Sequence, residues 1–178
     1  MNNDLIVMTF DNEQDALKAR GALEIMHISP FLGALNTLPV SRDAAGKVVY
    51  QAPQLPNDQV GPDSWIPNQF VNTIFGESEE EMQKLVAAGL DESFLKLIKT
   101  ALNPGCSMIL LYIRHDSLVD TQQVLEALKQ YNGTLYQTTI SPQVEDTISQ
   151  LERLGGLKNQ GVLTEEEFQA QKAKILST

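Results

Sequence analysis

The sequence predicts an α+β fold, with one sheet domain over residues 1–141 and a helical hairpin over residues 142–178. Short apolar runs of strand length alternate with capped, amphipathic helical segments. Residues 108–113 are continuously apolar, which is typical of a strand covered on both faces. A chain of 178 residues has room for one main core and a short appendage.

The first 50 residues predict a strand, a helix and a β-hairpin. Residues 5–10 form an apolar run, and Asp11 with Gln14 three residues later is typical of a capping-box helix start. The helix then carries one apolar face, made by Ala16, Ala19, Leu23 and Met26. Two apolar segments, 32–40 and 48–51, flank a turn that contains Gly46, so we expect a hairpin there.

Residues 52–76 form a long excursion that cannot pair as a strand or continue as one helix, because it contains four prolines: Pro53, Pro56, Pro62 and Pro67. Loops longer than about 12–15 residues are usually functional or mobile. The aromatic residues Trp65, Phe70 and Phe75 could cover a ligand pocket or a partner surface, or they could pin the loop to its own core. A short helix from about Pro67 would dock them.

Two capped helices precede the central strand. Ser78 with Glu81 starts the first helix and Gly89 ends it, while Asp91 starts the second. Their inward positions recur at helical spacing: Met82, Leu85, Val86, Phe94, Leu95, Ile98, Ala101 and Leu102. Asn103-Pro104-Gly105 stops the chain before the strand at 108–113, which we expect at the centre of the sheet.

A last helix and strand complete the sheet domain. Asp120 with Gln123 opens the helix, Asn132-Gly133 closes it, and residues 135–140 form the strand. The order strand, helix, strand therefore occurs twice, with the hairpin and the excursion between the two halves. A ferredoxin-like split βαβ sheet is the simplest assembly of these elements.

The tail begins after Ser141-Pro142, where polar, helix-forming sequence follows the strand. Its first helix carries an apolar stripe: Val144, Ile148, Leu151, Leu154 and Leu157. Gly161 can take the left-handed conformation that ends this helix. Thr164 with Glu167 then predicts a capping box, and Leu163 with Phe168 a hydrophobic staple.

A helical hairpin this short buries too little apolar surface to be stable alone. A stripe that faced water would be a patch that soluble monomers avoid, so we expect it to pack on a neighbouring chain, with a symmetric dimer favoured over other oligomers or a protein partner. The candidate interaction residues are Ile148, Leu151, Leu154, Leu157, Leu163, Phe168 and Ile175.

Residues 151–176, LERLGGLKNQGVLTEEEFQAQKAKIL, resemble the short C-terminal domain, SHOCT, of bacterial and archaeal proteins. The resemblance covers the spaced leucines, the glycine, the apolar pair, Thr-x-x-Glu-Phe, and the trailing lysine and leucine. Such modules end many unrelated proteins. The resemblance implies an interaction or oligomerisation role and no chemistry.

The body resembles a family of small bacterial proteins of unknown function with a ferredoxin-like fold. The matching segments are DLIV at 4–7, GLDESFLK at 89–96, PGCSMILL at 104–111 and LEAL at 125–128, with Gly133 following. In that family a glycine-rich apolar membrane hairpin interrupts the fold, whereas residues 52–76 are polar and rich in proline here. The resemblance therefore implies the fold alone.

The charge balance excludes several classes of partner. Lys+Arg 13 against Asp+Glu 23 gives a net charge of -10, which disfavours nucleic acid and anionic membrane surfaces. No window approaches the roughly 18 uninterrupted apolar residues of a spanning helix, so we expect no integral membrane segment. The single Cys106 and a start without signal-peptide features indicate a reducing, cytoplasmic location.

No set of residues predicts a chemistry. His27, His115 and Cys106 have no partners at metal-ligand spacing, and the glycines form no phosphate-binding loop. We therefore expect no metal, no cofactor, no catalytic residues and no enzyme. The sequence favours a non-enzymatic assembly or adaptor protein. The alternative is a small-molecule-binding or sensory domain, with its site between the sheet and the excursion at 52–76.

Overall fold

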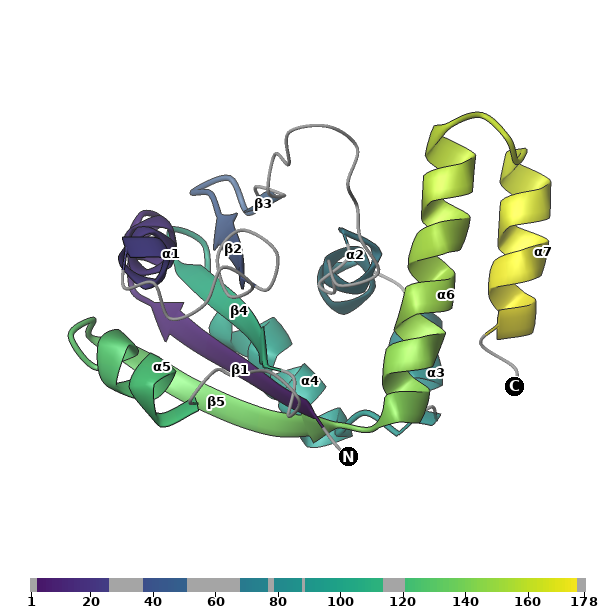
Figure 1. Cartoon of the computed structure of the whole chain (residues 1–178). Coiled ribbons are helices and arrows are strands. Elements are labelled where there is room, and N and C mark those ends of the chain that lie inside the picture. The colour runs from purple at the N-terminus through teal and green to yellow at the C-terminus, as the bar shows by residue number, and fades with distance from the viewer. Residues whose placement is uncertain are drawn as a thin grey trace.

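The computed structural model describes residues 3–25, 37–50, 68–76, 79–87, 89–113 and 121–175. They form a five-stranded antiparallel sheet with helices on both faces and a helical pair at the C-terminal end (Figure 1). The elements in chain order are β1 (Asn3–Phe10), α1 (Asp15–Ile25), β2 (Thr37–Arg42), β3 (Val48–Tyr50), α2 (Asn68–Phe75), α3 (Glu79–Ala87), α4 (Glu92–Ala101), β4 (Ser107–Ile113), α5 (Thr121–Leu128), β5 (Gly133–Ile140), α6 (Pro142–Asn159) and α7 (Glu165–Ile175).

The sheet order is β3-β2-β4-β1-β5, and each neighbouring pair is antiparallel. The segment with α1 joins β1 to β2 across β4, and the segment with α5 joins β4 to β5 across β1. Two interleaved, split βαβ units result, so the predicted ferredoxin-like sheet is confirmed. The β2–β3 hairpin adds one short strand at an edge.

Strand β4 lies at the centre of the sheet and is buried along its whole length, as predicted. Successive side chains of a strand point to opposite faces. Met108, Leu110 and Tyr112 enter the core on one face, and Ile109 and Leu111 enter the core on the other. Both faces therefore need a helical cover, which explains the continuous apolar run.

Helices from different parts of the chain supply these two covers. On one face α1 and α5 contribute Ala16, Ala19, Leu23, Val124, Ala127 and Leu128. On the other face α2, α3 and α4 pack against the sheet, and Val144 from the first turn of α6 joins the same core. Domain and tail therefore share one apolar cluster.

Helix α2 is the described part of the predicted excursion. It begins at Asn68, close to the expected start at Pro67, and its Val71 and Ile74 are fully buried in the core. Phe75 is half-buried against that core. Trp65 and the side chain of Phe70 lie outside the described residues.

The start of α1 differs from the predicted capping box of Asp11 and Gln14. Asn12 caps the helix instead, because its Oδ1 accepts hydrogen bonds from the backbone N–H of Gln14 at 3.0 Å and of Asp15 at 2.9 Å. The buried Ser107 hydroxyl donates to the Asn12 carbonyl at 2.6 Å and accepts from the Ala16 N–H at 3.3 Å. The first turn of α1 is thereby fastened to β4.

The other described turns follow the prediction. Gly46 has a φ of 85° and donates its N–H to the Asp43 carbonyl in the β2–β3 hairpin. Gly89, with a φ of 110°, ends α3, and Asp91 caps α4 by accepting from the Phe94 N–H at 2.8 Å. Only residues 37–40 of the predicted strand at 32–40 are described. The predicted cap at Ser78 lies outside the described residues.

Strand β5 starts at Gly133 rather than at residue 135. Gly133 was predicted to end the preceding helix, but α5 already ends at Leu128. Gly133 lies opposite Phe10 of β1 in the ladder. A Cβ at this position would meet the Thr9 carbonyl oxygen at 2.6 Å and Met8 side-chain atoms at 2.8 and 2.9 Å. Only glycine allows β1 and β5 to approach this closely.

In the described part of the chain, no helix combines the length and apolar content that a membrane crossing requires.

We predict that Gly133→Ala lowers the free energy of unfolding by about 1–3 kcal/mol, since the new methyl group overlaps backbone that cannot move away freely. Urea denaturation measures the change. Gly21→Ala is the matched control, because that glycine lies inside α1 and a new Cβ would meet nothing within 4 Å beyond its chain neighbours and the adjacent backbone of its own helix. It should raise stability by up to about 1 kcal/mol. Equal effects of the two substitutions would contradict the close approach at Gly133.

Candidate interaction surface

The C-terminal hairpin leaves the sheet through a capped helix start. Ser141 has extended backbone, with φ -73° and ψ 154°, and its hydroxyl accepts from the Val144 N–H at 3.4 Å. Pro142 occupies the first turn, where its missing N–H costs nothing. Because Val144 is buried in the sheet core, the direction of α6 is fixed from its first turn.

The turn between α6 and α7 closes on Gly161, as predicted. Its φ is 72°, and its N–H donates to the Lys158 carbonyl at 2.9 Å. The next N–H, of Val162, donates to the Leu157 carbonyl at 3.0 Å. These two bonds form a Schellman motif, which satisfies carbonyls at the end of α6 that have no partner within the helix.

Helix α7 starts with the predicted capping box. The Thr164 N–H donates to Glu167 Oε2 at 2.9 Å, and the Glu167 N–H donates to Thr164 Oγ1 at 3.2 Å. The backbone N–H and then the hydroxyl of Thr164 hold the pKa of Glu167 below its ordinary value, because both donate to the ionised carboxylate. Both groups of the box therefore fix the turn at neutral pH.

Phe168 joins the two helices. Its ring is buried, with Lys158 Nζ 4.6 Å and Lys172 Nζ 5.6 Å from the ring centroid. Lys158 also pairs with Glu165 at 2.6 Å, and this hydrogen bond, followed by one from Gln169, lowers the pKa of Glu165. One aromatic ring and one ion pair thus connect the last turn of α6 to the first turns of α7.

The predicted interaction residues differ in their burial. Leu151, Leu154 and Phe168 are buried within the chain itself, and Leu163 and Ile175 are half-buried. Leu157 is exposed. The side chain of Ile148 lies outside the described residues.

The buried residues pack inside one chain because α7 contacts α6 and α6 contacts α2. Figure 1 shows this order of α2, α6 and α7 beside the sheet. A neighbouring chain was expected to cover the stripe because the stripe would otherwise face water. Val144, Leu151 and Leu154 are already buried within the chain, so that argument does not apply to them. Helices α2 and α7 both contact α6, and the contact with the excursion helix α2 was not predicted from the sequence.

The tip of the hairpin keeps two apolar side chains in water. Leu157 is 40% exposed and Val162 is 62% exposed, the highest value among the large hydrophobic residues described. The hydrogen bond from the Val162 N–H to the Leu157 carbonyl holds these residues side by side. Sequence reasoning missed Val162, although its place just after the left-handed Gly161 is where a Schellman motif commonly has an apolar residue.

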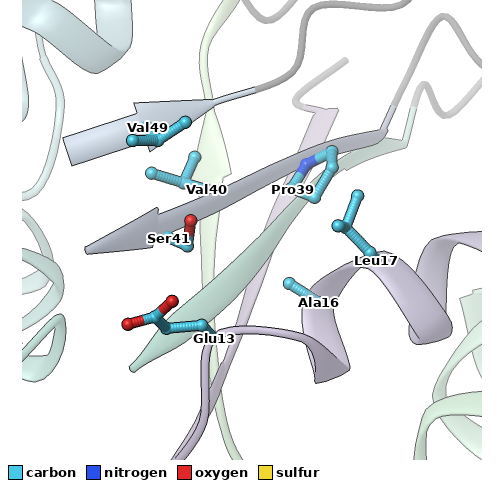
Figure 2. Close-up of a pocket in the computed structure, with 7 residues that line it drawn as sticks. All are labelled: Glu13, Ala16, Leu17, Pro39, Val40, Ser41 and Val49. Carbon is cyan, nitrogen blue, oxygen red and sulfur yellow. The ribbon is translucent and has the colours of Figure 1, made fainter. Parts of the chain in front are cut away.

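A small hollow lies between α1 and the β2–β3 hairpin (Figure 2). Its volume is about 40 Å³. It is lined by Glu13, Ala16, Leu17, Pro39, Val40, Ser41 and Val49. Pockets for small molecules usually measure about 300–1,000 Å³, so this hollow has room for water only.

Within the described residues, no three His, Cys, Asp or Glu side chains cluster as a metal site would require. The acidic groups with lowered pKa values all lie on helices: Glu165 and Glu167 are exposed, and Asp15 and Glu92 are half-buried. Each one is explained by a local lysine, amide or capping partner. None of them lies in a cleft.

Comparison with known proteins finds one similarity, which lies in the hairpin. Residues 149–176 match the short C-terminal domain family, SHOCT, which confirms the resemblance seen in the sequence. The matched region contains the end of α6, the tip and all of α7. No curated protein and no solved structure matches the chain.

We predict that Leu154→Ala lowers the free energy of unfolding by about 2–5 kcal/mol, because Leu154 is 3% exposed. Leu157→Ala makes the same change on the same helix at an exposed site, so its effect should stay within about 0.5 kcal/mol. Urea denaturation, with hydrogen exchange of the α7 amides, separates the two. Similar losses would mean that the inner face of α6 does not hold the hairpin.

We predict that Glu167 titrates below its ordinary pKa of 4.5. A lowered folded-state pKa contributes stability above the unfolded pKa, and this contribution is lost as the pH falls through the folded value. Carbon NMR of the carboxyl group gives the midpoint. Thr164→Ala removes the hydroxyl donor but keeps the backbone N–H, so it should move the midpoint part of the way back. A wild-type midpoint at or above 4.5 would show that the capping box does not form.

Proposed function

We propose that this chain is a non-enzymatic assembly or adaptor protein, which binds a second protein surface through the tip of its C-terminal hairpin. In the simplest case that surface belongs to another copy of the chain. One observation carries the proposal: the apolar residues that hold the hairpin together are buried, whereas Leu157 and Val162 at its tip face water.

The hairpin presents this tip in a fixed position. Helix α6 has 18 residues and so spans roughly 27 Å at 1.5 Å per residue, with its start anchored in the sheet core by Val144. Its far end is tied to α7 by the Schellman turn, the capping box and Phe168. A surface that is already ordered loses less conformational entropy on binding, which favours association.

The tip has the composition of a small interface. Leu157 and Val162 form an apolar centre beside the half-buried Leu163, and exposed Gln160 and Thr164 lie at its rim. Apolar centres with polar rims are typical of protein contacts. An area this small supports a weak or transient contact, or one that is completed by a second tip.

The match of residues 149–176 to the SHOCT family supports the proposal, because the tip lies inside the matched region. The resemblance of this segment implies an interaction or oligomerisation role. It implies no reaction, in keeping with the sequence, which offers no nucleophile, base and orienting group together. His27 and His115 lie outside the described residues, and Cys106 is half-buried.

The alternative, a small-molecule site between the sheet and the excursion, gains no support from the described part of the chain. Helix α2 fills that region with the buried Val71 and Ile74. Residues 51–67 lie outside the described residues, so the alternative remains a prediction. A thermal-shift screen addresses it, since a ligand at 100 times its Kd stabilises by about 2.7 kcal/mol.

We predict that Leu157→Ser combined with Val162→Ser weakens self-association without unfolding the chain, because exposed side chains contribute little to stability. Light scattering coupled to size-exclusion chromatography, over a range of concentrations, gives the mass. Leu17→Ser combined with Val49→Ser is the matched control, since Leu17 is 43% and Val49 42% exposed on the sheet domain. This control should keep the mass of the wild type.

An unchanged oligomer in the tip variant would count against self-association through the tip. An equal loss of mass in the control variant would lead to the same conclusion, because exposed apolar residues would then promote association wherever they lie on the surface. A shortened chain is not a suitable test, since Val144 and the packing of α6 on α2 belong to the body of the fold.

A further inference from the structure

Strand β5 presents an unusually open edge. It pairs with β1 over eight continuous positions, from Asn3 opposite Ile140 to Phe10 opposite Gly133, without a bulge. Among the described residues, no strand pairs with its other side. Its side chains are exposed at Thr134, Leu135, Gln137 and Thr139. Figure 1 shows β5 along the outer margin of the sheet.

An open edge exposes a row of backbone N–H and C=O groups that can pair with another strand. Proteins usually blunt such edges with charges, prolines, bulges or short strands. The opposite edge of this sheet is blunt because β3 has only three residues. Strand β5 has eight residues and none of these devices: its sequence is GTLYQTTI.

The charge pattern indicates which strand can occupy this edge. The chain has a net charge of -10, so two copies repel each other over most of their surface. Between Lys129 and Glu145, however, the sequence contains no charged residue, and β5 lies in the middle of this interval. Two copies can meet there without placing like charges opposite one another.

We propose that β5 pairs antiparallel with β5 of a second copy, so that the two five-stranded sheets join into one continuous sheet across a two-fold axis. The backbone of an edge strand is complementary to itself in this arrangement, and an isologous contact of this kind closes as a dimer. The contact uses neither α6 nor α7 and therefore stands independently of the function proposed for the hairpin.

Symmetry restricts the register. A two-fold axis normal to the sheet keeps every side chain on its own face, so opposite residues must both have even or both have odd numbers. If the axis lies near the middle of the strand, it lies midway between the two copies of Tyr136 or midway between the two copies of Gln137. With Gln137 opposite the partner's Gln137, Leu135 lies opposite the partner's Thr139. Every cross-strand pair is uncharged in either register.

The test uses the full chain with Gln137→Glu and Thr139→Glu. The new carboxylate at 137 lies directly opposite its copy in the Gln137 register and diagonally opposite it in the Tyr136 register, so like charges meet in both. We expect the dissociation constant of the dimer, measured by sedimentation equilibrium, to rise about tenfold or more. Added salt should restore part of this affinity, because it screens the exposed carboxylates. The matched control is Gln123→Glu with Gln171→Glu, which adds the same charge at exposed positions of α5 and α7. It should remain a dimer.

Hydrogen exchange of the wild-type chain gives a second measurement that no variant can obscure by misfolding. Amides of residues 133–140 should become more protected as the protein concentration rises, while those of β3 should not change. A wild-type chain that is monomeric up to its solubility limit overturns the proposal. The proposal is also overturned if the β5 variant and its glutamate control both remain dimeric, or if both become monomeric. A dimer that is lost in the tip variant of Leu157 and Val162 but kept in the β5 variant overturns it as well.

Discussion

The burial of β4 on both faces is the constraint on which the rest of the structure depends. Its apolar run leaves no face of the sheet that can remain in water, so two separate covers are required. The split βαβ connections supply α1 and α5 for one face. The segment between β3 and β4 supplies α2, α3 and α4 for the other. The long insertion in the chain is thus a structural part of the core, at least from Asn68 onward.

The same constraint determines what the tail can do. Val144 completes the second cover, which sets the direction of α6, and α2 then covers part of the inner face of α6. Leu151 and Leu154 are also buried within the chain. The apolar surface that remains available is at the far end, where Leu157 and Val162 face water. Interaction is therefore expected at the tip rather than along the helix.

Within the described part of the chain, two surfaces of different kinds are candidates for contacts with other chains. The tip offers apolar side chains in a fixed turn, and β5 offers backbone hydrogen-bonding groups in an uncharged stretch. A chain with a strong net negative charge can associate most easily where its own charges are absent or paired. At the tip Lys158 and Glu165 pair, and along β5 there are none.

Local signals in the sequence determined the order of the elements and several of their ends. Capping and glycine signals act over a few residues, so Asp91, Gly161 and the Thr164–Glu167 box could be predicted without the fold. The apolar run of β4 likewise determined a central strand. Tertiary structure alone decided which partner covers each apolar face, because periodicity shows that a face is buried but not against what. It packed α6 against both α2 and α7 and placed Gly133 against β1. It also left Val162 exposed and one side of β5 without a strand partner among the described residues.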